Sequence, residues 1–568
     1  MSIARRESKG QMAAGNVVGF PSGGTGSSNA GTAGTAGTAG TTPPPPTPPT
    51  PPGVISRNDT SRDVVDGLRK PEKATAHEVA ENVAAFVRTN IETFGGRLIN
   101  ADGAPYLFDG TDGRCYRISS RSGLFLSFLE QRYALGAGDA LRTHVIGILQ
   151  ADALAIPPVP VRRFTHFDRD TMTLYISRYD GKSWAIDGRA PTPDPNDPNA
   201  LPILELEDVP NGTGALFLDD DQGVSCTDPL CSANGTLFNR LIDDIQFVDG
   251  TDGGLTAAAQ ADLLKLWMMI LPFGSLLPAK PLLLVEGEKG SGKTSALQRI
   301  QAALHGYVLA QSVTSRGEED FGVTLLRSPI ALIDNTDTYI EWLRDALCAY
   351  VTGGGWVRRR KYTDDEQVEI RPQSFVALAT KNPATFRRDD VADRCLILRL
   401  ERRQDKGGYV PMGQLLEDIE RDRALIYGEW LYLLNSIVAE LRKGIPPTRS
   451  RHRLADFARI ANVIAPVIGL SDIDETLDAV QSERELFVIE DDPLTELLDR
   501  WLDDTTNVGR PIKALDLFSA LSELAKKLKT SFYKKQKTMV DRLRDNRAAL
   551  SAHFKISEAN GQYTIRRA

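Results

Sequence analysis

The stretch "EGEKGSGKTS", residues 286–295, has the residue types and the spacing of a phosphate-binding loop. Its glycines let the backbone bend tightly, so that its N–H groups face phosphate oxygens. Lys293 supplies a cation for the β- and γ-phosphates of ATP, and Thr294 supplies a hydroxyl ligand for Mg²⁺. The apolar run 282–285 predicts a buried strand before the loop, and the helix after it aims its N-terminal dipole at the same anion. The predicted nucleotide contacts are Gly287, Glu288, Lys289, Gly290, Ser291, Gly292, Lys293, Thr294 and Ser295.

A second candidate is the acid that ends the apolar run 330–333. Asp334 follows Thr294 by 40 residues, after an intervening helix, and fits the second Mg²⁺ contact. The next residue is Asn335, where most ATP-driven motors with this loop have a glutamate as general base. An amide can orient water but cannot take its proton. The proton then goes to the γ-phosphate or to another carboxylate, with Asp337, Glu319 and Asp320 as candidates. We expect a working but slow ATPase.

Three further segments follow the acid strand. The apolar run 374–380 predicts another strand, which ends in Asn382 before a proline. Arg394 precedes a further apolar run, 395–400, and Arg387 and Arg388 are nearby. Between them and the acid strand, residues 356–370 predict a β-hairpin with a basic first strand. Its basic residues are Arg358, Arg359, Arg360 and Lys361.

The rest of the chain must position these residues. With 568 residues, 41% of them hydrophobic, the chain is expected to hold about three or four domains. Residues 1–72 predict a disordered Gly/Thr/Pro tail. Residues 73–250 read as one α+β accessory domain or two small ones. Residues 251–405 form the predicted ATPase core, and residues 406–489 a helical lid and connector.

Residues 490–568 predict a basic domain made of two helices and a hairpin, which is a winged-helix arrangement. Within 510–568 there are 14 Lys and Arg against 5 Asp and Glu, in a protein whose net charge is −8. The Asn560–Gly561 pair predicts the tight turn of the hairpin. The second helix would present basic side chains to a DNA duplex, and protein contact is the alternative use. These side chains are Lys534, Lys535, Lys537, Arg542 and Arg544.

These motifs, in this order, resemble the AAA+/superfamily 3 helicase-like ATPases of phages, plasmids and integrated mobile elements. The resemblance rests on "GEKGSGKTS", "ALIDNTDTYIEWLRDALCAYVTGGGWVRRRKYTDDEQ", "RPQSFVALATKN" and "DVADRCLILRL", and covers about residues 255–470. It implies an α/β P-loop core and a homo-oligomeric ring of six subunits with ATP sites between subunits. It also implies a primase as a partner.

The resemblance further implies roles for single residues. Asn382 would reach the γ-phosphate and the attacking water, and the alternative is a structural asparagine in a turn before Pro383. Arg394 would be donated to the ATP of the neighbouring subunit, and the alternative is a surface salt bridge. The hairpin would grip single-stranded DNA in a central pore through sequence-independent phosphate contacts. The alternative is a charged, exposed hairpin.

We therefore expect an ATP-dependent DNA helicase or translocase that acts in replication of a phage, plasmid or integrated mobile element. The second hypothesis is a nucleotide-gated DNA-binding assembly, such as an initiator, a loader or a defence component, with slow ATP turnover. A small-molecule kinase would leave the hairpin and the basic C-terminal region unexplained. Scattered cysteines and the lack of a long apolar run predict a cytoplasmic protein with no membrane partner.

Overall fold

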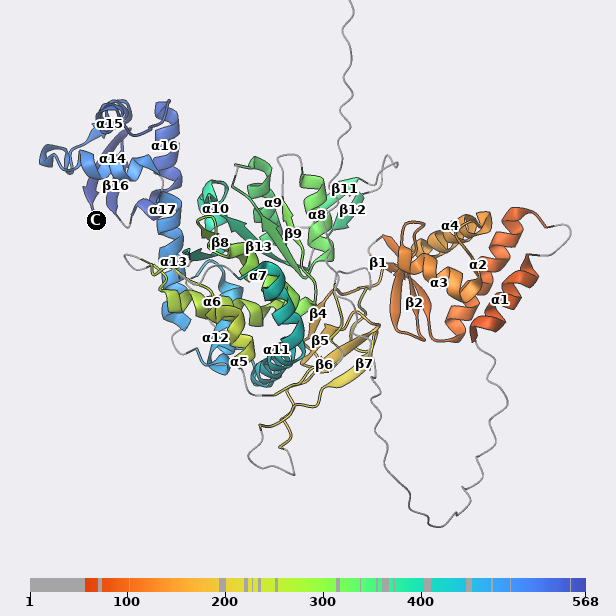
Figure 1. The fold of residues 1–568 in the computed structure, drawn as a ribbon. Helices are drawn as coiled ribbons and strands as arrows, with labels where there is room; N and C mark the ends of the chain where they lie inside the picture. Colours follow the sequence, from red (N-terminus) through yellow and green to blue (C-terminus); the bar gives the residue numbers. More distant parts are fainter. Residues whose placement is uncertain are drawn as a thin grey trace, which may run out of the picture. The chain divides into compact units, whose positions relative to one another are not determined.

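The computed structural model describes the chain in a series of segments and divides it into two compact units, with the boundary between Pro160 and Val161 (Figure 1). The described residues are 57–69, 74–101, 103–193, 201–218, 223–226, 228–232, 236–250, 254–312, 317–337, 339–353, 356–359, 367–370, 373–402, 410–445, 452–470, 473–490, 492–551 and 553–568.

The described part of the first unit packs helices against one face of a three-stranded antiparallel sheet of order β1-β2-β3. Its elements are α1 (Arg57–Leu68), α2 (Ala76–Thr93), β1 (Arg97–Ala101), β2 (Ala104–Asp109), β3 (Arg114–Arg117), α3 (Gly123–Tyr133) and α4 (Ala140–Ala155). A capping box starts α2: the Thr75 hydroxyl accepts from the Glu78 N–H, and the Glu78 carboxylate accepts from the Thr75 N–H. Val83, Val87 and Ile91 then follow at helical spacing and are buried.

Helix α1 lies inside the range 1–72, for which the sequence predicts a disordered tail, so that prediction is wrong for residues 57–68. The physical reason is a short apolar stripe on this helix. Val65 is fully buried in the core of the first unit, and Leu68 packs against the same core. Arg62 also donates two hydrogen bonds, of 3.0 and 2.7 Å, to the Gln131 carbonyl oxygen. Residues 1–56 lie outside the described residues.

The second unit begins with a four-stranded antiparallel sheet of order β4-β5-β6-β7. Its strands are β4 (Thr165–Asp168), β5 (Thr173–Ser177), β6 (Lys182–Ile186) and β7 (Glu207–Pro210), and helix α5 (Thr236–Asp243) follows. Phe167 of β4 meets Phe273 edge to face, with ring centroids 5.6 Å apart. The unit boundary at residue 160 thus falls inside the range 73–250, and residues 161–250 pack in one unit with the segment that carries the phosphate loop.

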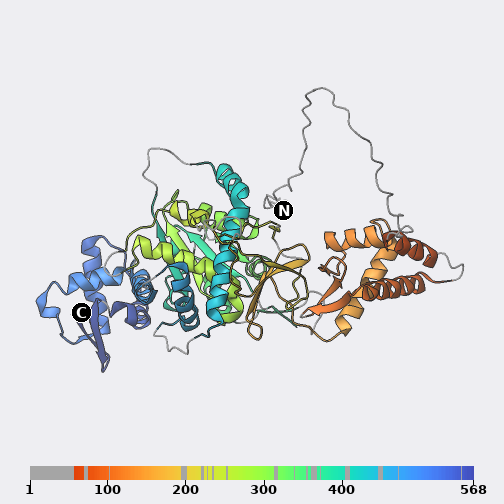
Figure 2. The same ribbon diagram turned by 90° about the horizontal axis from the view of Figure 1, so that it is seen from below.

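A five-stranded parallel sheet forms the centre of this unit (Figures 1 and 2). Its strand order is β14-β8-β13-β10-β9. The strands are β8 (Leu282–Gly287), β9 (Ala310–Ser312), β10 (Ile330–Asp334), β13 (Phe375–Thr380) and β14 (Cys395–Leu400). β8, β10, β13 and β14 are mainly apolar, as parallel strands covered on both faces require, and the exceptions inside them are Glu286 of β8 and Arg399 of β14. This sheet confirms the predicted α/β core.

Helices cover both faces of the sheet. Leu283 and Val285 of β8 point into a cluster with α6, α7 and α11, whereas Leu282 and Leu284 point into a second cluster with α8, α9 and α10. These helices are α6 (Ala257–Ile270), α7 (Lys293–His305), α8 (Glu318–Arg327), α9 (Glu341–Val351), α10 (Asp389–Ala392) and α11 (Met412–Leu441), with the 3₁₀ helix η1 (Leu271–Leu276) after α6.

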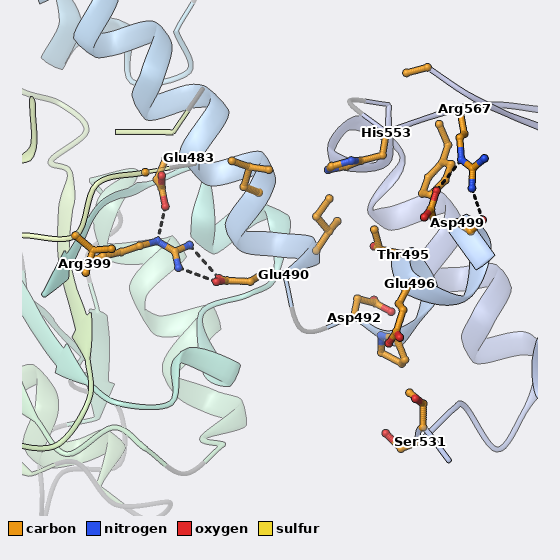
Figure 3. Close-up of a pocket in the computed structure, with 18 of the residues that line it drawn as sticks. Arg399, Glu483, Glu490, Asp492, Thr495, Glu496, Asp499, Ser531, His553 and Arg567 are labelled. Atoms are coloured by element: carbon orange, nitrogen blue, oxygen red, sulfur yellow. Dashed lines mark hydrogen bonds and ion pairs between the residues drawn. The ribbon is translucent and has the colours of Figure 1, made fainter. Parts of the chain in front are cut away.

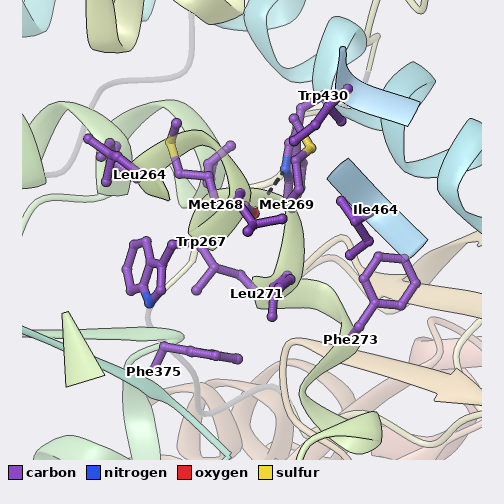
Figure 4. Packing of buried hydrophobic residues seen from close by; sticks show 14 of the residues in the cluster. Leu264, Trp267, Met268, Met269, Leu271, Phe273, Phe375, Trp430 and Ile464 are labelled. Carbon is purple, nitrogen blue, oxygen red and sulfur yellow. Dashed lines mark hydrogen bonds between the residues drawn. The ribbon is translucent and has the colours of Figure 1, made fainter. Parts of the chain in front are cut away.

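Large side chains fill the first of these clusters (Figure 4). The Trp267 ring stands perpendicular to that of Phe375, with centroids 6.2 Å apart, a geometry that aromatic pairs prefer. The indole N–H of Trp430 donates to the Met268 carbonyl oxygen at 3.4 Å, so this helix of the predicted lid is tied to α6. The core of the sheet and the lid is therefore continuous.

Two antiparallel strands, β11 (Trp356–Arg359) and β12 (Gln367–Ile370), confirm the predicted hairpin. Arg358 and Arg359 lie on β11, opposite Val368 and Gln367. Arg360, Lys361 and the turn lie outside the described residues, as do the side chains of both strands. The hairpin follows α9 and leads into β13, so it is inserted directly before the strand that neighbours the phosphate-loop strand.

Helices dominate residues 411–490, and a small mixed domain ends the chain. The helical part contains α11, α12 (Ala455–Ile464), the 3₁₀ helix η3 (Ala465–Ile468) and α13 (Ile473–Ile489). The final part contains α14 (Pro493–Trp501), η4 (Thr505–Asn507), β15 (Ile512–Lys513), α15 (Ala514–Leu528), α16 (Gln536–Asp545), α17 (Arg547–Leu550), β16 (Phe554–Ala559) and β17 (Gln562–Arg567).

The last three strands form a sheet of order β15-β17-β16. Asn560 and Gly561 both have positive φ, 52° and 71°, as the predicted tight turn between β16 and β17 requires. The predicted order of helix, helix and hairpin is therefore present, and the assignment as a winged helix remains a prediction. Across the described segments, no helix has both the length and the apolar character needed to cross a bilayer.

Candidate nucleotide site

The phosphate loop lies between β8 and α7, as predicted. Gly287 has φ 156°, and a Cβ there would lie 2.2 Å from the Leu400 carbonyl oxygen, so a side chain is excluded. Gly292 caps α7 in the left-handed region, with φ 83° and ψ 8°, which glycine adopts without strain. The loop thus turns sharply and delivers the positive end of the α7 dipole to its concave side.

Lys293 is folded onto the loop. Its Nζ donates to the carbonyl oxygens of Gly287, at 2.7 Å, and Glu288, at 2.8 Å, and to the Ser291 hydroxyl at 3.3 Å. Burial lowers the pKa of Lys293, and Lys381 acts in the same direction, while the carboxylates of Asp337 and Asp334 oppose the shift. When a nucleotide binds, the Lys293 ammonium can exchange its present acceptors in the loop for phosphate oxygens, with which it forms stronger, charge-assisted hydrogen bonds.

Thr294 and Asp334 meet across the carboxyl edge of the sheet. The Thr294 hydroxyl donates to the Asp334 carboxylate at 2.9 Å, so two hard oxygen donors from α7 and β10 lie side by side. Mg²⁺ favours oxygen ligands and is commonly held by one or two protein oxygens together with substrate phosphates. The donor pair therefore fits the predicted ion. No cluster of three or more His, Cys, Asp or Glu suited to a metal occurs in the described segments, so this pair would need phosphate or water oxygens to complete the coordination.

Asn335 has a structural role that the sequence did not suggest. Its backbone is left-handed, with φ 58°, and its N–H donates to the Asp334 carboxylate at 2.9 Å. Among residues with a Cβ, asparagine is one of the few that adopt this region readily. A glutamate at this position would be strained, which gives a backbone reason for the missing general base.

Substitutions of Asn335 distinguish two roles of this residue: the left-handed turn of its backbone and the positioning of water by its side-chain amide. Asn335→Ala is expected to lower the free energy of unfolding by about 1–2 kcal/mol, the cost of a left-handed residue with a Cβ, whereas Asn335→Gly is expected to change it by under about 0.5 kcal/mol. Chemical denaturation of the purified variants measures both values. If Asn335→Gly retains full ATP turnover, the predicted role of the amide in positioning water is wrong and the turn is its only function.

The carboxyl end of β13 lies between the phosphate-loop strand and the acid strand, and here Asp337 gathers several donors. Its carboxylate accepts from the Lys381 N–H at 2.8 Å and the Thr380 hydroxyl at 3.2 Å, and the Lys381 ammonium lies 3.6 Å away. Burial raises the pKa of Asp337, but the hydrogen bonds from Lys381 and Thr380 outweigh it, so the pKa lies below its usual value. Asp337 is thus an ionised carboxylate beside Lys293.

Asn382 lies at this edge as predicted, directly after β13. Its side-chain oxygen accepts from the Ala384 N–H at 3.2 Å and caps the 3₁₀ helix η2 (Pro383–Thr385). Its N–H donates to the Thr380 hydroxyl at 3.1 Å. This cap is the structural role that the sequence left open. The predicted contact with phosphate and water remains a prediction, for which the amide nitrogen and the second lone pair of the amide oxygen are left.

The three candidate arginines all contact their own chain. Arg394 donates to the Asp390 carbonyl oxygen, and Arg388 is paired with the Asp390 carboxylate. Arg387 lies 3.4 Å from Glu490, and its guanidinium stacks over a phenylalanine ring of α13. Arg388 and Arg387 are thus ion-paired within their own chain, whereas the contact of Arg394 is a hydrogen bond to a backbone carbonyl oxygen and not an ion pair. A role in a neighbouring subunit would require the chosen arginine to leave its present partner.

A small cavity of about 110 Å³ adjoins the outer side of the phosphate loop. Ser295, which was predicted to contact the nucleotide, is in its wall together with Gly290, Ser291 and Gly292. The rest of the wall is mixed: Ile245, Ala296, Leu400, Val410 and Leu415 are apolar, and Asp244, Gln246 and Arg299 are polar or charged. The cavity is therefore only partly apolar, and it lies beside the phosphate loop.

A buried charge network adjoins the other side of β8. Arg399 lies 2.8 Å from Glu286 and from Glu490, and 2.5 Å from Glu483, so three carboxylates share one guanidinium. Burial raises the pKa of Glu286 to about 7, and Glu490 and Glu483 also raise it, while Arg399 lowers it. Figure 3 shows Arg399, Glu483 and Glu490 at one wall of a cleft of about 1020 Å³, with Asp492, Glu496 and Asp499 across from them. This cleft is not lined by the phosphate loop.

The raised pKa of Glu286 predicts a pH dependence of stability. Between its ordinary value of 4.5 and about 7, the folded state binds more protons than the unfolded state, so stability falls as pH rises through this window. A shift of this size corresponds to about 3 kcal/mol at 1.36 kcal/mol per pH unit. Glu286→Gln should therefore flatten the decline in unfolding free energy between pH 5 and pH 8. The exposed Glu420→Gln serves as the control and should retain the wild-type profile; an equal profile for Glu286→Gln would contradict the prediction.

Only some of the basic side chains predicted to contact DNA in the C-terminal domain lack an acidic neighbour among the described residues and are exposed. Arg542 lines a cavity of about 630 Å³ together with Arg388 and Asp389, and Arg544 is paired with Glu558 at 2.8 Å. The other three predicted contacts are exposed: Lys534, Lys535 and Lys537. Lys534 and Lys535 precede α16 and do not lie on it.

Part of the chain matches a known protein family. Residues 254–483 match the model of the actinomycete integrative conjugative element replication protein family. This match confirms the predicted resemblance to replication proteins of mobile elements, over nearly the same residues. No curated protein matches the chain.

Two solved structures are similar over most of their length. One is "SCCmec type IV Cch - active helicase", at 12% identity and a TM-score of 0.39, covering 82% of this chain and 90% of that chain. The other is the apo NrS-1 C-terminal region, at 10% identity and a TM-score of 0.38, covering 85% of this chain and 99% of that chain.

The sequence interpretation missed Lys381, Arg399 and the buried acid Glu286. Lys381 is adjacent to the predicted Asn382, so its place at the strand end was available as a signal. Glu286 precedes the loop in an apolar strand, and a charge at such a position indicates a buried partner. The pairing of Glu286 with Arg399 could not be predicted, because β14 and β8 are more than a hundred residues apart in the sequence.

Proposed function

We propose that this protein is an ATP-dependent DNA helicase or translocase that acts in the replication of an integrated mobile element. The observation that carries the proposal is the meeting of Thr294 and Asp334 beside Lys293, at the carboxyl edge of a parallel sheet. Ligands of open α/β sheets bind at this edge. The family match to a replication protein supports the choice of DNA as the second substrate.

Each residue of the site has a role in this proposal. Lys293 exchanges its loop carbonyls for the β- and γ-phosphate oxygens, and the N–H groups of the loop bind the same phosphates. Thr294 and Asp334 would hold Mg²⁺, which when bound offsets phosphate charge. Asp337 accepts the proton of the attacking water or holds Lys381 toward the γ-phosphate, and Asn335 and Asn382 orient that water. The partly apolar cavity beside Ser295 would receive the base.

The proposed DNA contacts lie outside the nucleotide site. The hairpin β11–β12 carries Arg358 and Arg359, with Arg360 and Lys361 following, and would contact single-stranded DNA in the pore of a homo-oligomeric ring, most simply a hexamer. The basic C-terminal domain would contact a duplex. Arg394, with Arg387 and Arg388 as rivals, would reach the neighbouring subunit's ATP, and a primase would supply the primers.

One observation favours the second candidate, a nucleotide-gated DNA-binding assembly with slow turnover. The position after Asp334 carries an asparagine in a left-handed turn, where a glutamate base would be strained. All three candidate arginines also contact their own chain. In this alternative, ATP binding orders the assembly and hydrolysis only resets it.

ATP turnover measured with and without DNA decides between the two candidates. The translocase predicts turnover that DNA stimulates and that Lys293→Ala abolishes, with strand displacement in a parallel assay. ATP-dependent DNA binding without measurable turnover would exclude the translocase and retain the assembly. Sedimentation with and without ATP would test the ring at the same time.

A further inference from the structure

The outward face of the C-terminal hairpin carries a basic hollow that none of the predicted DNA contacts includes. A cavity of about 500 Å³ lies along β16 and β17 and reaches α17. Its polar lining consists of three basic side chains and three hydroxyls: Arg547, Lys555, Arg566, Ser551, Ser557 and Thr564. No acidic side chain lines it.

Strand register places four of these residues in two neighbouring rungs. Lys555 lies directly opposite Arg566, and Ser557 lies directly opposite Thr564. Because side chains alternate between the two faces of a strand, all four point to the same face, with the rungs about 7 Å apart at 3.3 Å per residue. Phe554, Ile565 and Tyr563 belong to the other face and are buried in the domain core.

Few acidic side chains surround the basic residues on this face. Neither Lys555 nor Arg566 forms an ion pair with any residue that the structure describes, and both are exposed. Arg547, at the start of α17, donates to the Ile556 carbonyl oxygen at 3.3 Å, which fixes it at the edge of the hollow. Glu558 is paired with Arg544 at 2.8 Å, and its carboxylate also interacts electrostatically with Arg547. Three positive charges thus line one hollow, whereas on the predicted helix Arg542 interacts with Asp389 and Arg544 is paired with Glu558.

We infer that this hairpin face, with Arg547, Lys555 and Arg566 as its cations, binds the phosphodiester backbone of duplex DNA. Basic and hydroxyl side chains are the ones that contact phosphate oxygens in protein–DNA complexes. The hollow exposes no aromatic ring, because Phe554 is only 2% exposed. Proteins that bind single strands stack the bases on exposed aromatic rings, so this face lacks their main feature. The contact is therefore sequence-independent and directed to the duplex. This inference rests on the proposed function and locates one of its DNA sites.

Two charge-matched triple variants of the full-length protein test the assignment. The first is Arg547→Gln/Lys555→Gln/Arg566→Gln, and the control is Lys534→Gln/Lys535→Gln/Lys537→Gln, which also removes three positive charges. Binding to a fluorescent blunt duplex, and to a single strand of the same sequence, is measured over a series of KCl concentrations. Thermal unfolding of each variant verifies that it is folded.

The Arg547/Lys555/Arg566 triple variant is expected to bind the duplex at least about tenfold more weakly. The slope of log affinity against log salt concentration should be shallower by about 2.7, at 0.9 per lost phosphate contact. The control is expected to lose much less. Equal loss in both variants would show that net charge alone matters, and a loss confined to the control would return the site to the helix; either result overturns the inference. Loss of single-strand binding only would overturn the duplex assignment. A wild-type protein that binds no DNA at all would instead refute the proposed function.

Discussion

Lys293→Ala is expected to reduce ATP turnover at least about 100-fold, the cost of removing one preorganised charge from a site of this kind. The Nζ of this lysine already lies at the mouth of the loop, held by two carbonyl oxygens and one hydroxyl. Its removal leaves the loop folded, because Gly287 and Gly292 set the turn. The loss should therefore appear in turnover and in nucleotide affinity, with little change in stability.

Turnover is measured by phosphate release at saturating ATP and Mg²⁺, and affinity by titration with a fluorescent ATP analogue. The exposed Lys443→Ala, at the end of α11, is the matched control and should retain wild-type turnover. Turnover above one tenth of the wild-type rate in Lys293→Ala would mean that hydrolysis occurs elsewhere, and the assignment of this loop as the ATP site would fail.

Asp337→Asn is expected to reduce turnover by about 10²- to 10⁴-fold, the range for loss of a general acid–base group. Asp337 is the carboxylate that shares the edge with Lys293 and holds both Thr380 and Lys381. Since its pKa lies below the ordinary value, the wild-type carboxylate stays ionised as pH falls toward 5. Turnover of the wild type should accordingly show no loss from this group between pH 8 and pH 5.

The measurement is steady-state phosphate release by Asp337→Asn beside Asn335→Gly, with the exposed Asp170→Asn as a control. A large loss in Asp337→Asn and a small one in Asn335→Gly would identify Asp337 as the group that replaces the usual glutamate. Full turnover in Asp337→Asn would direct attention to Glu319 or Asp320 on α8, or to the γ-phosphate as proton acceptor.

Local patterns were sufficient to predict the parts of the site that are contiguous in the chain. The strand, loop and helix around Lys293 follow from an apolar run, glycine spacing and a helix start, and each was found where expected. Asp334 was also predicted correctly at the end of its strand, beside Thr294. Both predictions depend on residues whose conformation is determined within a few positions.

Features that depend on pairing between distant segments could not be predicted. The contact of Asp337 with Lys381 arises because β10 and β13 are neighbours in the sheet, and the Glu286–Arg399 pair arises because β8 and β14 are. The left-handed backbone of Asn335 at the end of β10, with its N–H donating to the Asp334 carboxylate, was not predicted either. Likewise, the partner of Arg544 is Glu558 on β16, which follows α16 after the intervening helix α17.

The position of β13 has a mechanical consequence. This strand is paired on both sides, is buried along all six residues, and spans about 20 Å at 3.3 Å per residue. Its far end carries Thr380, followed by Lys381 and Asn382, and only four residues separate its near end from the hairpin strand β12. A strand paired on both sides resists bending and stretching. A displacement of its nucleotide end along the strand axis is therefore expected at its other end, Phe375, with no relay of side chains in between.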